Sequence, residues 1–301
     1  MSFWIATDVC CDLPVSYIKK QERFLVAPMA YQMDSQVVEI DPYDENADST
    51  MHEFYQKLVA GSIATTSQVT LQTWLDVLTP ICEEGSDILI LTFSSALSGT
   101  FNAASTIAKE LSIKYENCKI QVVDTLCASL GQGMLVQQVI AQRDSGKSLG
   151  ECMQYALDNI QRTIHWFTVN DLHFLRRGGR VSVASAYIGS ILKIKPVLNV
   201  SPDGKLIARE KVQGRKQSLR ALLEKAREYA LEPEKQTMYI SHGDSLSDAT
   251  WLADKLKDEL NVPEVVIGMV GPIIGSHSGP GTIALFFAGK DGAGRLTPSE
   301  E

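Results

Sequence analysis

The sequence has few of the residues that build metal, redox or disulfide sites. Its six cysteines include no Cys-x-x-Cys pair, and no two of its five histidines have the spacing of metal ligands. The cysteines lie in apolar surroundings, which is typical of buried free thiols. We therefore expect no metal and no resident cofactor.

The chain also lacks a long apolar run and an excess of basic charge. No apolar stretch approaches the ~18 residues that cross a bilayer. Residues 1–8 read as a first strand and have neither the basic start nor the apolar length of a signal peptide. A formal net charge of −8 argues against a general attraction to nucleic acid. These absences predict a cytoplasmic protein with no transmembrane segment and no nucleic-acid partner.

The order of apolar segments predicts an α/β fold with two domains. A chain of 301 residues is longer than one hydrophobic core usually fills. In its first half, apolar strands alternate with helices, as in a doubly wound, Rossmann-like parallel sheet. The expected strands cover 3–8, 87–93 and 119–124, and the expected helices cover 70–84, 101–113 and the region through 134–140. Two further runs, 24–33 and 36–40, flank a turn and predict a small inserted β-hairpin.

A second α/β unit is predicted after a helix that begins at Ser148. Ser148 and Glu151 have the spacing of a capping box, as do Thr50 and Glu53 earlier in the chain. The later strands are expected at 166–169, 196–200, 205–212, 238–240, 265–270 and 283–287, with helices over 215–229 and 247–259. We place the boundary between an N-terminal domain of residues 1–161 and a C-terminal domain of residues 162–301.

Three short segments rich in hydroxyls and glycines carry the functional information. They are Thr65–Gln68, Ser94–Thr100 and Gly275–Thr282. Each is expected where a turn or strand end meets a helix or loop, so each can direct backbone N–H and hydroxyl donors at one small anion. His277 stands out because the surrounding glycines of an expected tight loop allow close backbone approach. Together the segments predict a site for a carboxylate or phosphate.

Two familiar catalytic motifs fail when their context is considered. Residues 141–148 resemble a phosphate-binding loop, but they begin with Ala141 instead of glycine and follow a predicted helix rather than a strand. Gly243–Leu246 spells the signature of a lipase-like esterase group, yet Ile274 stands three residues before His277, where that group needs an aspartate. The sequence also contains no Gly-x-Ser-x-Gly elbow.

Serine-dependent catalysis nevertheless remains an alternative. Ser95 or Ser98 beside His277 would give an acyl hydrolase or transferase. Hydroxyls in a strand-to-helix turn more often act as helix caps or anion donors. The residues therefore favour binding over catalysis, with no catalytic residue assigned.

Five blocks, in this order, resemble the DegV family of bacterial fatty-acid-binding proteins over essentially the whole chain. The blocks are Thr66-Ser67-Gln68, Ser94-Ser95-x-Leu97-Ser98-Gly99-Thr100, Leu175-Arg176-Arg177-Gly178-Gly179-Arg180, Lys193-x-Lys195-Pro196 and His277-x-Gly279-Pro280-Gly281. The chain departs from the family pattern at Val9, where a serine is usual, and at Val69, where a proline is common.

The resemblance implies that one long-chain fatty acid lies in a tunnel of a two-domain α/β protein. It implies that Thr66 and Ser95 hydrogen-bond the carboxylate and that His277 faces the same group. Ser67 and Ser94 would support them. The bound acid would be presented to a separate ATP-dependent fatty acid kinase that makes an acyl phosphate for phospholipid metabolism.

Two questions stay open beside the resemblance. Arg176, Arg177 and Arg180 form either a solvated surface turn or a docking patch for the kinase, because local basic charge on an acidic protein can steer a partner. A lipid-sensing regulator with a different partner is a further alternative.

Overall fold

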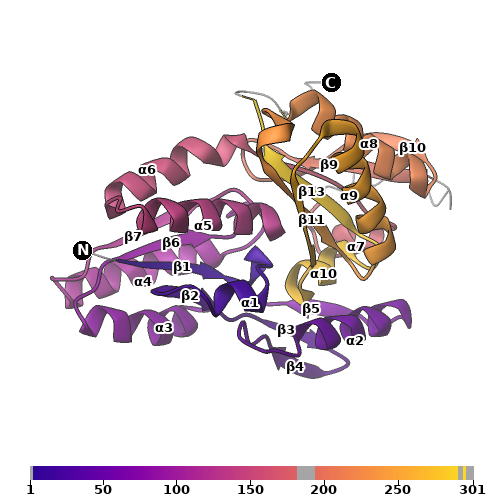
Figure 1. Ribbon diagram of the computed structural model, residues 1–301. Coiled ribbons are helices and arrows are strands. Elements are labelled where there is room, and N and C mark those ends of the chain that lie inside the picture. The colour runs from indigo at the N-terminus through magenta and orange to yellow at the C-terminus, as the bar shows by residue number, and fades with distance from the viewer. Residues whose placement is uncertain (1–2, 182–193, 291–293, 296–301) are drawn as a thin grey trace.

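The chain forms two α/β units, each built on its own sheet, with a small third sheet attached to the first unit (Figure 1). The computed structural model describes residues 3–181, 194–290 and 294–295; Lys193 of the fourth motif block lies outside these ranges. The predicted α/β class with two units is confirmed. In the described ranges no helix has the length and apolar character needed to cross a bilayer.

The first sheet is parallel, with strand order β2-β1-β6-β7. Its strands are β1 Trp4–Asp8, β2 Phe24–Ala27, β6 Ile88–Thr92 and β7 Ile120–Asp124. Every residue of β6 is buried, as its continuous apolar run predicts for a strand covered on both faces. Helices α3 Leu71–Glu83 and α4 Thr100–Lys114 cover one face, and α5 Ser129–Asp144 and α6 Leu149–Asn159 cover the other (Figure 1). The short α1, Val15–Ile18, lies between β1 and β2 in the chain.

The inserted hairpin is present, and it is part of a three-stranded sheet of order β4-β3-β5. Its strands are β3 Ala30–Met33, β4 Gln36–Glu39 and β5 Ala64–Thr66. The single run expected over 24–33 is divided near Pro28, which has no N–H to donate to a ladder, so β2 joins the main sheet instead. The first hydroxyl segment therefore begins as an edge strand and is not a simple linker.

One capping box is confirmed and the other prediction is wrong. Ser148 and Glu151 bond reciprocally at the start of α6. Helix α2 runs over Ala47–Val59, so Thr50 lies inside it, where its hydroxyl donates to the Asn46 carbonyl at 3.2 Å. Thr50 is thus unavailable to cap the helix.

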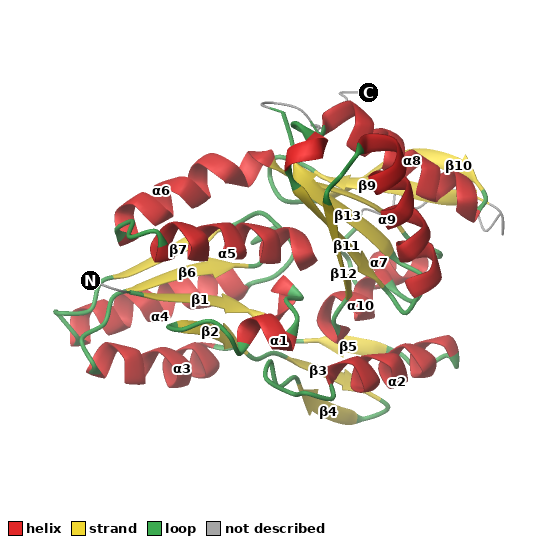
Figure 2. Cartoon of the chain, in the orientation of Figure 1, coloured by secondary structure: helices red, strands yellow, loops and turns green. Residues whose placement is uncertain are grey.

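The second sheet has six strands in the order β10-β9-β8-β13-β11-β12, antiparallel except between β11 and β12 (Figure 2). The strands are β8 Thr163–Thr168, β9 Ile194–Val200, β10 Leu206–Gln213, β11 Thr237–His242, β12 Glu264–Met269 and β13 Ile283–Ala288. Helices α8 Arg215–Tyr229 and α9 Leu246–Leu260 pack on one face through a shared apolar core. The other face turns toward α5 of the first unit (Figure 1). Our boundary at 161/162 falls just before β8 and stays a prediction.

Helix α10, Pro272–Ser278, connects the two units. It belongs to the C-terminal half, yet it contacts α2, β3 and β5 of the N-terminal half and packs on α7, His173–Arg177 (Figure 1). The tight loop expected over Gly275–Thr282 is therefore wrong for its first half. The turn begins only at Gly279, whose φ of +76° favours glycine. His277 consequently lies in the last turn of α10, and the helix backbone fixes the direction of its side chain.

Candidate ligand-binding site

A cavity of about 270 Å³ lies between the two units. Its floor is the inner face of the second sheet, because alternate residues of a strand point the same way. Those residues are His165 and Phe167 of β8, Ala284 and Phe286 of β13, Val200 of β9 and Leu206 of β10. The first unit supplies the opposite wall, including Met29, Phe93, Leu97, Ala128 and Ser129. The lining is mainly apolar, as expected of a pocket for a small organic ligand.

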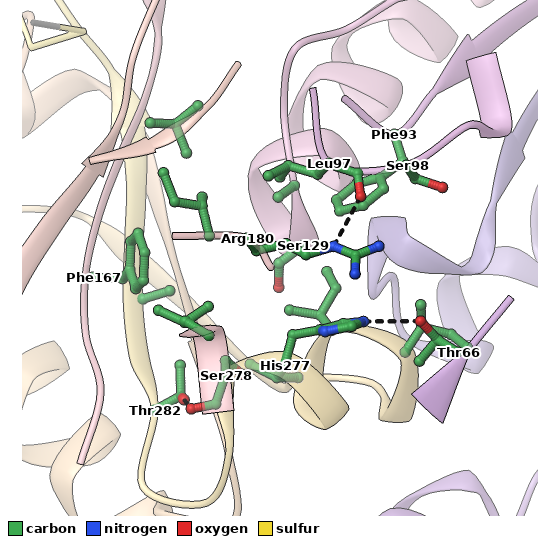
Figure 3. Close-up of a pocket in the computed structure, with 18 of the residues that line it drawn as sticks. Thr66, Phe93, Leu97, Ser98, Ser129, Phe167, Arg180, His277, Ser278 and Thr282 are labelled. Atoms are coloured by element: carbon green, nitrogen blue, oxygen red, sulfur yellow. Dashed lines mark hydrogen bonds between the residues drawn. The ribbon is translucent and has the colours of Figure 1, made fainter. Parts of the chain in front are cut away.

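Polar groups gather at one part of this cavity. Thr66, Ser98, Arg180 and His277 all line it, and they come from four separate segments of the chain (Figure 3). Thr66 Oγ1 lies 2.8 Å from His277 Nε2. His277 Nδ1 is buried and has no hydrogen-bond partner among the described residues. The structure thus brings together Thr66 and His277, which the resemblance assigns to the same carboxylate.

His277 is neutral at physiological pH. Burial lowers its pKa to about 4, and the positive charges of Arg180 and Arg177 act in the same direction. A neutral imidazole has one N–H donor and one acceptor nitrogen, so Nε2 either donates to the Thr66 hydroxyl or accepts from it.

Arg180 points into the cavity rather than out from a surface patch (Figure 3). Its Nε donates to the Leu97 carbonyl at 3.1 Å, and a terminal nitrogen donates to the carbonyl of Gly178. These bonds aim the guanidinium across the space above His277. The grouping of Arg180 with Arg176 and Arg177 as one docking patch is thus corrected: only the latter two are exposed.

Gly178 is required by the packing around His277. A Cβ built on Gly178 would lie 2.0 Å from His277 Nδ1, closer than any side chain tolerates. Gly178, the first glycine of the Gly178-Gly179 pair, therefore leaves the space that the His277 imidazole occupies.

The three serines of the second segment have different surroundings. Ser94 is fully buried and donates to the Gly204 carbonyl at 3.0 Å, while Ser95 is exposed and its N–H donates to Asp124 Oδ1 at 3.0 Å. Neither lines the cavity, whereas Ser98 does. The turn from Ser94 to Ser98, closed by a 3.1 Å backbone bond, directs the first two hydroxyls away from the ligand space.

Ser67 occupies the rim. It lines the cavity and is exposed, but its hydroxyl donates to the Ala30 carbonyl at 3.2 Å. That bond is made within the small sheet, so Ser67 fixes the strand end that carries Thr66.

The geometry of a serine hydrolase is missing from the described ranges. His277 Nε2 is bonded to Thr66, and Ser98 Oγ lies 2.9 Å from the Thr100 hydroxyl instead. No serine hydroxyl in residues 3–181 and 194–290 hydrogen-bonds to a histidine. In the esterase-like segment Ser245 Oγ is 2.9 Å from Asp248, beside the start of α9. The described residues also contain no group of three side chains suited to a metal ion.

Comparison with known proteins agrees with the motif blocks. The family model described as "Uncharacterised protein, DegV family" matches residues 2–290. The chain belongs to the DegV family. A DegV domain-containing protein from Clostridium perfringens is 38% identical over 289 residues, which cover 95% of this chain and 97% of that protein.

Solved DegV-family structures share the fold over nearly the whole chain. The structure described as fatty acid binding of a DegV family protein from Thermus thermophilus matches with a TM-score of 0.84 and 28% identity, covering 96% of this chain and 100% of that one. The Streptococcus pneumoniae Fatty Acid Kinase (Fak) B3 protein, loaded with linoleic acid, matches with a TM-score of 0.82 and 18% identity, covering 96% and 99%. The second likeness supports the fold of this DegV-family chain.

Proposed function

We propose that this protein binds one long-chain fatty acid between its two units. The carboxylate would lie among Thr66, Ser98, Arg180 and His277, and the acyl chain would run along the apolar floor. The observation that carries the proposal is the mainly apolar cavity with Thr66, Ser98, Arg180 and His277 at one part of it. The fatty-acid-binding relative from Thermus thermophilus supports the ligand class.

The acyl chain would supply most of the affinity. Burial contributes about 0.8 kcal/mol per methylene, so a chain of about fourteen methylenes offers roughly 11 kcal/mol before ordering costs. Charge-assisted hydrogen bonds at the head contribute about 1.5–3 kcal/mol each, part of which offsets the desolvation of the carboxylate. The head group therefore orients the ligand more than it retains it.

Arg180 gives the head-group site its positive charge. Its guanidinium stays protonated at any physiological pH, whereas His277 is neutral, so the carboxylate would face one full charge together with neutral donors. This proposal replaces Ser95 with Ser98 and adds Arg180 to the set inferred from the sequence. Ser67 and Ser94 keep supporting roles through the backbone bonds described above.

We further propose that the bound acid is presented to a separate ATP-dependent fatty acid kinase. The resemblance in sequence and the name of the Streptococcus pneumoniae neighbour make such a kinase the partner to test. Ser67 and Gln68 are exposed at the rim, and Arg176 and Arg177 are exposed on α7 nearby. These arginines would steer an acidic face of the kinase, since rim charges chiefly affect association rates.

Titration with palmitate and oleate tests the binding proposal. The protein, delipidated first, should bind both acids, and Arg180→Gln should weaken binding roughly tenfold or more through loss of a charge-assisted bond. Arg220→Gln, on an exposed position of α8 away from the cavity, is the matched control and should bind like the wild type. Absence of binding by the delipidated wild type would refute the proposal.

The kinase step needs its own measurement. Arg176→Glu combined with Arg177→Glu should slow association with the kinase, with a smaller effect at high salt because exposed charges are screened. Acyl-phosphate formation should slow accordingly. An unchanged association rate would remove the docking role of these arginines.

A further inference from the structure

We propose that His165 and Phe286 form a rigid end wall of the acyl channel and set the longest chain that the protein accepts. The inference rests on the proposed fatty-acid function. It concerns which acids are bound, and no property of the head group enters it.

The two rings lie at the opposite end of the floor from the polar groups. Thr282, which lines the cavity, bonds through its hydroxyl to the Ser278 carbonyl of α10, beside His277. From Thr282 to Phe286 the backbone is extended over four residues, roughly 13 Å at the rise of a strand. Phe286 pairs with His165 in the sheet, so both rings stand at this distance from the head-group site.

The His165 ring is held by both of its nitrogens. Nδ1 lies 2.8 Å from the Thr163 carbonyl, which can only accept, and Nε2 lies 3.2 Å from the Ala128 N–H, which can only donate. These partners fix one neutral tautomer with the proton on Nδ1. Burial lowers the pKa of His165 well below its ordinary value, consistent with that neutral form. The ring therefore cannot rotate without losing two buried hydrogen bonds.

The Phe286 ring and the backbone of α5 block displacement of the His165 ring toward that helix. The two rings pack edge to face, with centroids 5.1 Å apart and planes at 90°. On the side of α5, a Cβ added to Gly131 would lie 2.2 Å from His165 Nε2 and 2.7 Å from a ring carbon of Phe286. The rings already fill the space up to the helix backbone.

The region beyond His165 is also occupied. Arg295, only 6% exposed, donates from Nε to the Thr163 carbonyl at 3.0 Å and from a terminal nitrogen to the Leu126 carbonyl at 2.8 Å. A chain that extended past His165 would have to displace this hydrogen-bonded arginine. Affinity should thus rise about fourfold per methylene up to the wall and then fall abruptly.

Two substitutions should move the wall in opposite directions. Phe286→Ala removes a ring and should shift the preferred chain length upward by roughly two to four carbons, because the vacated volume admits further methylenes. Gly131→Ala places a methyl group against both rings and should push them into the channel, which shifts the preference to shorter acids. Gly150→Ala in α6, where an added Cβ meets nothing within 4 Å, is the control and should leave the preference unchanged.

The assay is competition among saturated acids of increasing length for the full-length protein, read by native mass spectrometry. Because Phe286→Ala removes a buried ring, Phe286→Leu provides a milder variant that should shift the preference in the same direction. Folding of each variant is checked by circular dichroism. Opposite shifts for Phe286→Ala or Phe286→Leu and for Gly131→Ala would support the wall.

The outcomes separate this inference from the proposed function. If the wild type binds no acid, the proposed function fails. If the wild type binds acids with a length preference that folded Phe286→Leu and Gly131→Ala leave unchanged, the wall is refuted while the binding function stands.

Discussion

Substitution of Gly178 by alanine should weaken acid binding although the glycine itself need not touch the ligand. Its φ of −74° and ψ of −6° are accessible to alanine, so the backbone carries no penalty. The added Cβ would stand 2.0 Å from His277 Nδ1, and an ordinary contact requires the imidazole to retreat by about 1.4 Å. A displacement of that size breaks the 2.8 Å contact between Thr66 and His277.

The magnitude follows from the bond that His277 would make to the carboxylate. Losing one charge-assisted hydrogen bond costs about 1.5–3 kcal/mol, or roughly 10- to 150-fold in the dissociation constant. The acyl chain should still bind, so affinity should fall without vanishing. Isothermal titration of delipidated protein with palmitate measures the change directly.

Gly179→Ala is the matched control for this experiment. Gly179 has a φ of +69° and open space around its Cα, so alanine there costs about 1 kcal/mol of folding stability through backbone strain without contacting His277. Its acid affinity should equal that of the wild type. If Gly178→Ala binds palmitate as tightly as Gly179→Ala does, His277 makes no contact that matters for acid binding.

Two further predictions concern the hydroxyls and the imidazole. Ser98→Ala should weaken acid binding by several-fold while Ser95→Ala does not, because only Ser98 lines the cavity; equal effects in titration would contradict this placement. The folded-state pKa of His277, about 4, lies below the ordinary value of 6.5, so its contribution to stability is fully present above pH 6.5 and is lost as the pH falls toward 4. Denaturant unfolding of the wild type and His277→Gln should therefore diverge by about 1–3 kcal/mol across that interval, and parallel curves would show that His277 is not buried in neutral form.

Much of the fold follows from local patterns in the sequence. The apolar run of β6 and the capping box of α6 each depend on neighbouring residues, and both are found as expected. Thr50 has the same capping spacing but lies inside α2, because that helix begins three residues earlier, at Ala47. The spacing of capping residues alone therefore does not predict the residue at which α2 begins.

The sequence indicated which kinds of residues form the site better than it indicated the directions in which their side chains point. Thr66 and His277 lie in contact, and the family resemblance assigns both to one carboxylate. The choice between Ser95 and Ser98 depends on the direction of a tight turn, which the sequence does not encode in its spacing. The basic neighbours of Arg180 in the sequence suggested a charged surface turn. Gly178 was the residue of that segment whose type could have indicated close packing against another side chain.

A crystal structure of the protein with palmitate would show directly whether the carboxylate lies at the proposed site. We expect one acid in the cavity between the units, with its carboxylate oxygens within hydrogen-bonding distance of Thr66, Ser98, Arg180 and His277. A palmitate bound elsewhere, or a cavity that stays empty at saturating palmitate, would contradict this expectation.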